Sequence, residues 1–320
     1  MSIESTSKST GHPQMKMRAA TMLIVTLLLW ASAFAGIRSA LQSYSPGAVI
    51  LLRFLIASIA LIIYAFITRL RLPALRDIPA LLLLGFFGIT VYQAGLTFGE
   101  QTVPAGTASF LISSVPCFTA LFAVIFLKER LSRWGWLGVL ISFIGVTIIS
   151  FGTGSGFNFT PNTLLILLAA FSESVYFIFQ KNYLSKYSGI ELTAYTIWAG
   201  TLFMLVFAPE LIQQMPIASL SSTLSIVYMG IFPAAIAYVT WAYTLSHLPA
   251  SRATSFLNLS PILSILIAWI WLREIPSPLA IWGGMLVIAG VLLVNKRSKQ
   301  SLIEEPIANQ VEIAYADHLK

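Results

Sequence analysis

Hydrophobic stretches of about 20 residues follow one another along most of the chain, separated by short polar breaks. About 20 apolar residues are what a helix needs to cross a bilayer, and such uninterrupted runs are too long for the strands of a membrane barrel. Because a chain in hydrocarbon must satisfy its own backbone polar groups, the pattern predicts an all-α integral membrane protein with ten transmembrane helices. The expected spans are residues 17–41, 47–68, 78–100, 104–127, 133–151, 162–184, 191–211, 221–246, 249–272 and 278–295.

The fourth and ninth stretches are copies of one another. Residues 104–129 and 249–274 align without a gap at a constant spacing of 145 residues, with nine of 26 positions identical. The most informative identities are Pro104 and Pro249, Pro116 and Pro261, and Glu129 and Glu274. Each half then holds five spans, and this odd number predicts that the two copies insert in opposite senses, as inverted repeats. We expect a tail over residues 1–16, repeats over 17–151 and 162–295, and a second tail over 296–320.

Composition and charge agree with a membrane protein. Hydrophobic residues make up 57% of the chain and charged residues 10%, whereas soluble domains are about a quarter charged. The net charge of +7 is spread over short loops, which disfavours a nucleic-acid surface. If the N-terminus is cytoplasmic, 16 of the 19 Lys and Arg residues fall in cytoplasmic segments, so both termini are predicted there. One cysteine and three histidines leave little for a metal, and we expect neither metal nor cofactor.

Glu173 is the principal candidate for chemistry. It lies about 11 residues into the sixth stretch, roughly 16 Å deep, close to the middle of a hydrocarbon core of about 30 Å. Ionisable residues at such depth usually face a cavity and mark substrate or proton pathways. Glu173 is expected to bind a cationic or amino group or to exchange a proton; the alternative is a protonated or Arg-paired structural residue. Ala169, Tyr176 and Gln180 share its helical face, which favours a cavity over lipid.

Arg53 lies about two turns below the outer end of the second span. It could hold a substrate carboxylate, and together with Glu173 it would suit a zwitterion; alternatively, it snorkels or ties helices together. The remaining candidate substrate-binding residues are Trp30, Tyr176, Gln93, Asn258, Ser113 and Tyr238. Core filling and close helix packing are the alternative roles of these aromatic and small polar residues. Pro116 and Pro261 each remove a backbone hydrogen bond, so we expect kinks and hinges at equivalent points.

Several short patterns also occur in a characteristic order. The first is Trp30-Ala31-Ser32-Ala33-Phe34, and the second is Pro46 followed by Arg53. The third occurs once in each half and consists of a proline, a span end of Leu-Lys/Arg-Glu and two glycines. These glycines are Gly138 and Gly145 in the first half and Gly283 and Gly290 in the second. In this order, over roughly residues 17–295, the chain resembles the drug/metabolite transporter superfamily, specifically its ten-helix EamA type.

The resemblance implies a bacterial inner-membrane carrier. Spans one to four and six to nine would surround a central cavity, with spans five and ten peripheral. Members are similar to exporters of amino acids and other metabolites, and some import. One departure concerns the sixth span, which commonly carries a Trp-Ala pair where this chain has Glu173-Ser174. At a spacing near 143 residues, Glu173 aligns with Trp30 of the first span.

The sequence therefore predicts a secondary carrier that works by alternating access, exporting a small amphipathic or cationic metabolite such as an amino acid in exchange for protons. No G-x-x-x-x-G-K-[ST] loop is present to hold ATP phosphates. No nucleophile with a base lies at membrane depth, so an enzyme is not expected. Import by the same fold, or a channel-like or non-transporting protein, stays open. The expected partners are a small-molecule substrate, the lipid bilayer and protons; the glycines could pack the peripheral helices or form a homodimer contact.

Overall fold

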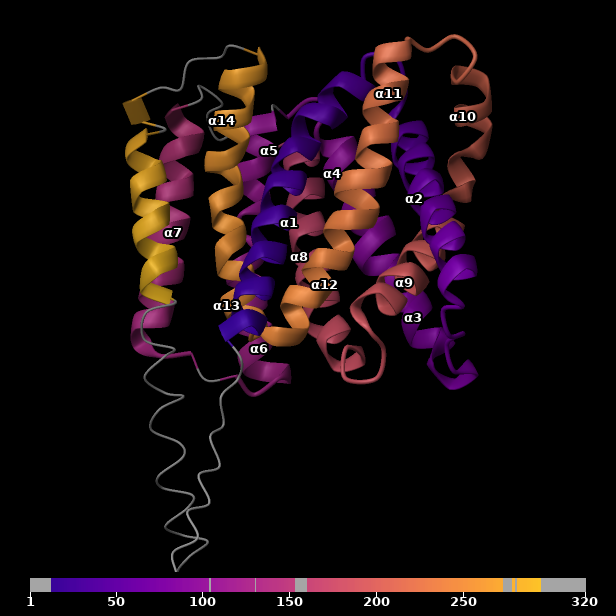
Figure 1. Ribbon diagram of the computed structural model, residues 1–320. Helices are drawn as coiled ribbons and strands as arrows, with labels where there is room; N and C mark the ends of the chain where they lie inside the picture. The colour runs from indigo at the N-terminus through magenta and orange to yellow at the C-terminus, as the bar shows by residue number, and fades with distance from the viewer. Residues whose placement is uncertain are drawn as a thin grey trace, which may run out of the picture.

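The computed structural model describes residues 13–103, 105–129, 131–152, 160–272, 278–279 and 281–294. These residues form an all-helical bundle (Figure 1) with ten spans, as the hydrophobic pattern predicts. Large apolar side chains such as Phe66, Val206 and Leu292 are exposed on its outer face. Apolar exposure of this kind is suited to lipid rather than to water.

Five spans are single helices. They are α1 (Pro13–Ala40), α2 (Pro46–Thr68), α7 (Arg133–Gly152), α8 (Pro161–Tyr183) and the tenth span, Ile281–Val294. Local signals set their ends: Ser45 and Thr160 cap α2 and α8 through their side chains, and each cap is followed by a proline in the first helical turn.

The other five spans are interrupted. The third consists of η1 (Leu75–Asp77), α3 (Ile78–Gly85), η2 (Phe86–Val91) and α4 (Tyr92–Gly99). The fourth is α5 (Ala105–Ile112) and α6 (Val115–Phe126), and the seventh is α9 (Gly189–Met204), η3 (Leu205–Phe207) and α10 (Ala208–Gln214). The eighth is α11 (Leu220–Met229), η4 (Gly230–Ile236) and α12 (Ala237–His247), and the ninth is α13 (Ala250–Ser255), η5 (Phe256–Leu259) and α14 (Ser260–Leu272).

The interruptions of the third and fourth spans recur at equivalent places in the eighth and ninth, whereas η3 of the seventh span has no counterpart in the continuous helix α2. The π-helical segments η2 and η4 coincide at the spacing of 145 residues. The fourth and ninth spans both break shortly before a proline, Pro116 or Pro261, which is the second residue of the next helical segment. Proline cannot donate to the preceding turn, so the kinks predicted at these two positions are confirmed. Whether the breaks act as hinges stays a prediction.

The fifth and tenth spans lie side by side at one edge of the bundle (Figure 1). A Cβ atom on Gly138 would come within 2.7 Å of the carbonyl oxygen of Gly290, and one on Gly145 within 2.7 Å of that of Gly283. Gly283 and Gly290 are the copies of Gly138 and Gly145, so each glycine meets the copy of the other. This crossed pairing requires antiparallel helices related by a twofold axis, which confirms the predicted inverted repeats.

Other contacts join a residue to its own copy. The Gln93 amide Nε2 donates to the Tyr238 hydroxyl at 3.2 Å, and these two positions are 145 residues apart. The hydroxyls of Ser58 and Thr201, 143 residues apart, are hydrogen-bonded at 2.8 Å. A residue can touch its own copy only near the twofold axis, so these pairs mark where the axis passes through the bundle. The repeat interface is where inverted-repeat transporters place their substrate sites.

Candidate functional site

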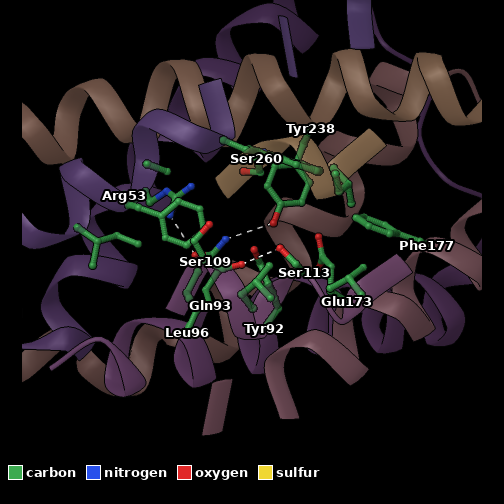
Figure 2. Close-up of a pocket in the computed structure, with 17 residues that line it drawn as sticks. Arg53, Tyr92, Gln93, Leu96, Ser109, Ser113, Glu173, Phe177, Tyr238 and Ser260 are labelled. Atoms are coloured by element: carbon green, nitrogen blue, oxygen red, sulfur yellow. Dashed lines mark hydrogen bonds between the residues drawn. The ribbon is translucent and has the colours of Figure 1, made fainter. Parts of the chain in front are cut away.

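A cavity lies where the axis crosses the centre of the bundle (Figure 2). The volume open to water-sized molecules inside it is about 50 Å³. Its walls come from α1, α2, α4, α5, α8 and α12 and from the breaks in the fourth and ninth spans. Six of the predicted site residues line it together: Trp30, Arg53, Gln93, Ser113, Glu173 and Tyr238.

Arg53 is held in the wall by a short hydrogen-bond chain. Its side chain is 2% exposed, and its Nη1 donates to the Gln93 Oε1 at 3.0 Å. Gln93 in turn donates through Nε2 to Tyr238, which fixes the orientation of the amide. The Arg53 Nε has no hydrogen-bond partner among the described residues. An arginine held this way presents a fixed positive charge at the cavity with donor capacity to spare.

Glu173 lies on α8 among aromatic rings. It is 3% exposed, and its Oε2 has no hydrogen-bond partner among the described residues. Trp30 stacks on Phe177 with ring centroids 6.2 Å apart and meets the ring of Tyr238 edge-on at 5.4 Å. A carboxylate beside aromatic faces is an arrangement that recognises an ammonium group. Figure 2 shows Arg53 and Glu173 toward opposite sides of the cavity, with Gln93 and Ser113 between them.

Two predicted site residues lie outside the cavity lining. The ring of Tyr176 packs directly against Gly88, and its hydroxyl lies 3.3 Å from that of Thr196. Asn258 is buried in η5, and its Oδ1 has no partner among the described residues. Ala169 packs near Gly95. Ala169 and Tyr176, which share a face of α8 with Glu173, therefore pack toward the third span. Glu173 is the residue of that face that lines the cavity.

Three features were not foreseen from the sequence. Phe177 and Ser260 line the cavity; the first follows Glu173 by one helical turn and the second directly precedes Pro261. Glu100 is a second deeply buried carboxylate, 1% exposed, with both oxygens unpartnered among the described residues. The sequence placed Glu100 at the end of a span, where such a residue is ordinarily hydrated, and so gave no signal of its burial.

Glu129 has partners that the sequence did not indicate. Its carboxylate pairs with Lys181 of α8 at 3.2 Å and accepts the Ser251 hydroxyl at 2.6 Å. Burial alone would raise the pKa of Glu129. The Ser251 hydroxyl, the Lys181 charge and the backbone N–H groups of Ala250 and Ser251 outweigh burial and hold that pKa below its usual value. Glu274, its copy, lies outside the described residues.

Comparison with known proteins shows which family this sequence matches. The model of the EamA-like transporter family matches residues 17–151 and 161–296. The chain is 48% identical over 275 residues to the uncharacterized transporter YdfC of Bacillus subtilis, covering 85% of this chain and 90% of YdfC. It is 38% identical over 281 residues to a protein of Streptantibioticus cattleyicolor named a probable terminal-alkyne amino-acid exporter, covering 88% of this chain and 94% of that protein.

Two more distant matches agree. The uncharacterized inner membrane transporter YedA of Escherichia coli is 27% identical over 252 residues, covering 77% of this chain and 80% of YedA. A protein of known crystal structure superposes with a TM-score of 0.72 at 19% identity, covering 88% of this chain and 98% of that one. At this identity the superposition shows a shared fold.

Proposed function

Because the chain belongs to the EamA-like transporter family, we propose that it is a secondary carrier of the bacterial inner membrane that exports small zwitterionic metabolites, in particular amino acids with apolar side chains. The protein is a multi-pass membrane transporter rather than an enzyme. Its substrate class, direction and coupling are the proposed part. The proposal also has both termini in the cytoplasm, because most Lys and Arg residues then fall in cytoplasmic segments.

The observation that carries the proposal is that Arg53 and Glu173 line one cavity from different sides. A substrate carboxylate would bind the Arg53 guanidinium, and its ammonium would bind Glu173 and the faces of Trp30 and Phe177. Hydrogen bonds to charged groups contribute about 1.5–3 kcal/mol each. The rest of the wall includes Phe34, Ile112, Leu257 and other apolar residues, which suits an uncharged side chain.

Export and proton coupling follow from how Glu173 can be neutralised. A buried carboxylate without a cation is costly in a membrane, so Glu173 binds either a proton or the substrate ammonium, and each excludes the other. When an incoming proton replaces the outgoing ammonium group on Glu173, the movement of protons down their gradient drives export of the substrate. The name of the Streptantibioticus relative, an amino-acid exporter, supports the same substrate class and direction.

Counterflow in proteoliposomes tests the carrier. Vesicles preloaded with unlabelled L-norvaline, a small apolar amino acid, should take up labelled L-norvaline from outside in a saturable, transient overshoot. A channel gives linear uptake without overshoot, and a protein that moves no zwitterion gives none; either result contradicts the proposal.

Direction is tested in cells. A bacterial host that expresses the protein should hold less L-norvaline inside and tolerate more of it outside than a host with an empty vector. Accumulation of L-norvaline above the empty-vector level would instead show import by the same fold and overturn export.

A further inference from the structure

We propose that Glu129, Lys181 and Ser251, which we term the clasp, form the gate that closes the cytoplasmic end of the transport path. Glu129 follows α6 and reaches across the repeat interface to the first residues of the ninth span. Its Oε1 accepts the Ala250 backbone N–H at 2.8 Å, and its Oε2 accepts the Ser251 N–H at 3.2 Å and the Ser251 hydroxyl at 2.6 Å.

Lys181 adds a third span to the same contact. Its Nζ donates to the Glu129 Oε1 at 3.2 Å and to the Leu248 carbonyl oxygen at 2.8 Å. The chain turns back toward these partners at Lys128, whose φ of 53° lies in the left-handed region. The ends of spans four and six and the start of span nine are thus held together by one carboxylate and one ammonium group.

The position of the clasp relative to the cavity indicates a gate. The lining residues lie near the breaks of the fourth and ninth spans or toward the end of the bundle where α1 and α4 end. The clasp lies at the opposite end: Glu129 follows the 12 residues of α6, and Lys181 lies on α8 four residues after the lining residue Phe177, about 6 Å further along the helix at 1.5 Å per residue. Figure 1 shows α6 and α13 together at this end, where α1 begins.

Side chains of α1, α8 and α12 pack against one another between the cavity and the clasp. Trp241 is fully buried there, with its ring centroid 4.6 Å from that of Phe177 and 5.4 Å from that of Trp30. Thr26 and Thr240 are hydrogen-bonded at 2.7 Å and join α1 to α12. The structure is therefore a state closed at the end that we assign to the cytoplasm. A substrate can enter from that side only if α6 and α13 separate, which breaks the contacts of Glu129.

The gate rests on the proposed alternating access, but its test measures accessibility and needs no substrate. A single-cysteine protein, Cys117→Ala with Ser260→Cys, places a thiol in the cavity wall. A membrane-impermeant methanethiosulfonate is then applied to inside-out and right-side-out vesicles. With an intact clasp, labelling from the cytoplasmic face should be at least tenfold slower than from the outer face.

Removing the clasp charge should reverse this preference. Glu129→Gln should raise the rate of cytoplasmic labelling at least fivefold and lower the rate of outer labelling. Glu191→Gln is the matched control, because the hydrogen bonds that Glu191 accepts from Ser188 lie within one capping box and hence within one repeat. It should leave both rates unchanged.

A second variant guards against misfolding. Ser251→Ala keeps the carboxylate and both backbone hydrogen bonds, and it should raise cytoplasmic labelling by about twofold. Unchanged cytoplasmic labelling in both Glu129→Gln and Ser251→Ala, with outer labelling retained, would overturn the gate while leaving transport of L-norvaline untouched. An equal rise in Glu191→Gln would overturn it as well, because the effect would then be general loosening of that end.

Discussion

The two repeats share a scaffold but not a binding surface. Both carry a π-helical segment in the third span of the repeat, a break before the proline of the fourth, and a serine cap at the start of the second. Their cavity positions differ: Trp30 against Glu173, Arg53 against Thr196, and Gln93 against Tyr238. Duplication therefore supplies a symmetric frame suited to two opposite states. Divergence places Arg53 of the first repeat and Glu173 of the second in the cavity wall, and the proposed substrate site depends on this difference.

The largest effect on transport is expected when the carboxylate that the second repeat contributes to the cavity is removed. Glu173→Gln should lower transport of L-norvaline about 10- to 100-fold, because a charge-assisted hydrogen bond to the ammonium is lost. Initial counterflow rates at equal protein levels measure this. Glu100→Gln is the control, a buried carboxylate that does not line the cavity, and it should keep most of the activity. Equal loss in both variants would mean that burial, rather than the cavity position, explains the effect.

Removing the positive charge of Arg53, in the first repeat, should mainly weaken binding of the substrate carboxylate. Arg53→Gln should raise the KM for L-norvaline about tenfold or more. In the double variant with Glu173→Gln, transport should stay low. Recovery to near the wild-type rate would show that the two charges only neutralise each other and do not bind substrate.

The shared scaffold should be most sensitive at the crossing of the peripheral helices. Gly145→Ala places a methyl group 2.7 Å from a backbone oxygen of the partner helix, and we expect overpacking to cost about 1–3 kcal/mol of unfolding free energy. Gly284→Ala is the matched control, since its Cβ would meet nothing nearer than 3.5 Å, and it should be neutral or slightly stabilising. Unfolding in SDS compares the two; equal stability would contradict the close crossing.

The hydroxyl pair on the twofold axis should contribute less. Ser58→Ala breaks the bond to Thr201, and interhelical hydrogen bonds in membrane proteins are worth about 0.6 kcal/mol on average. A double-mutant cycle with Thr201→Val isolates this pair. A coupling energy indistinguishable from zero would mean that packing alone holds the axis there.

The smallest effect concerns pH at the clasp. The pKa of Glu129 is lowered from its ordinary 4.5, so the stabilisation from its ionised form is complete above about pH 4.5 and is lost only as pH falls through the lower folded value. The ratio of cytoplasmic to outer labelling rates of the cavity cysteine should therefore be constant between about pH 6 and 8, because ionisation of the thiol changes both rates alike. A rise across this range would show that the clasp titrates near neutrality.

The features that could be predicted from the sequence are those that the hydrocarbon core of a bilayer constrains directly. Span lengths follow from hydrocarbon thickness, and charged residues such as Arg53 and Glu173 are conspicuous because charge is costly at membrane depth. The π-helical segments leave no comparable mark, because they depend on packing between helices. Tyr176 shows the limit for site residues: three positions along α8 from Glu173, it turns to Gly88 rather than to the cavity. Which part of a buried face meets the cavity is decided by neighbouring spans.

The most direct test of the asymmetric site is competition by three forms of one amino acid. L-Norvaline, its cationic methyl ester and its anionic N-acetyl derivative share a side chain and differ in charge, and each competes with labelled L-norvaline in counterflow. The wild type should prefer the zwitterion at least tenfold over either derivative. Arg53→Gln should lose the preference over the ester, and Glu173→Gln the preference over the N-acetyl form. If both variants lose both preferences equally, or the wild type shows none, Arg53 and Glu173 do not bind the carboxylate and ammonium ends of the substrate separately.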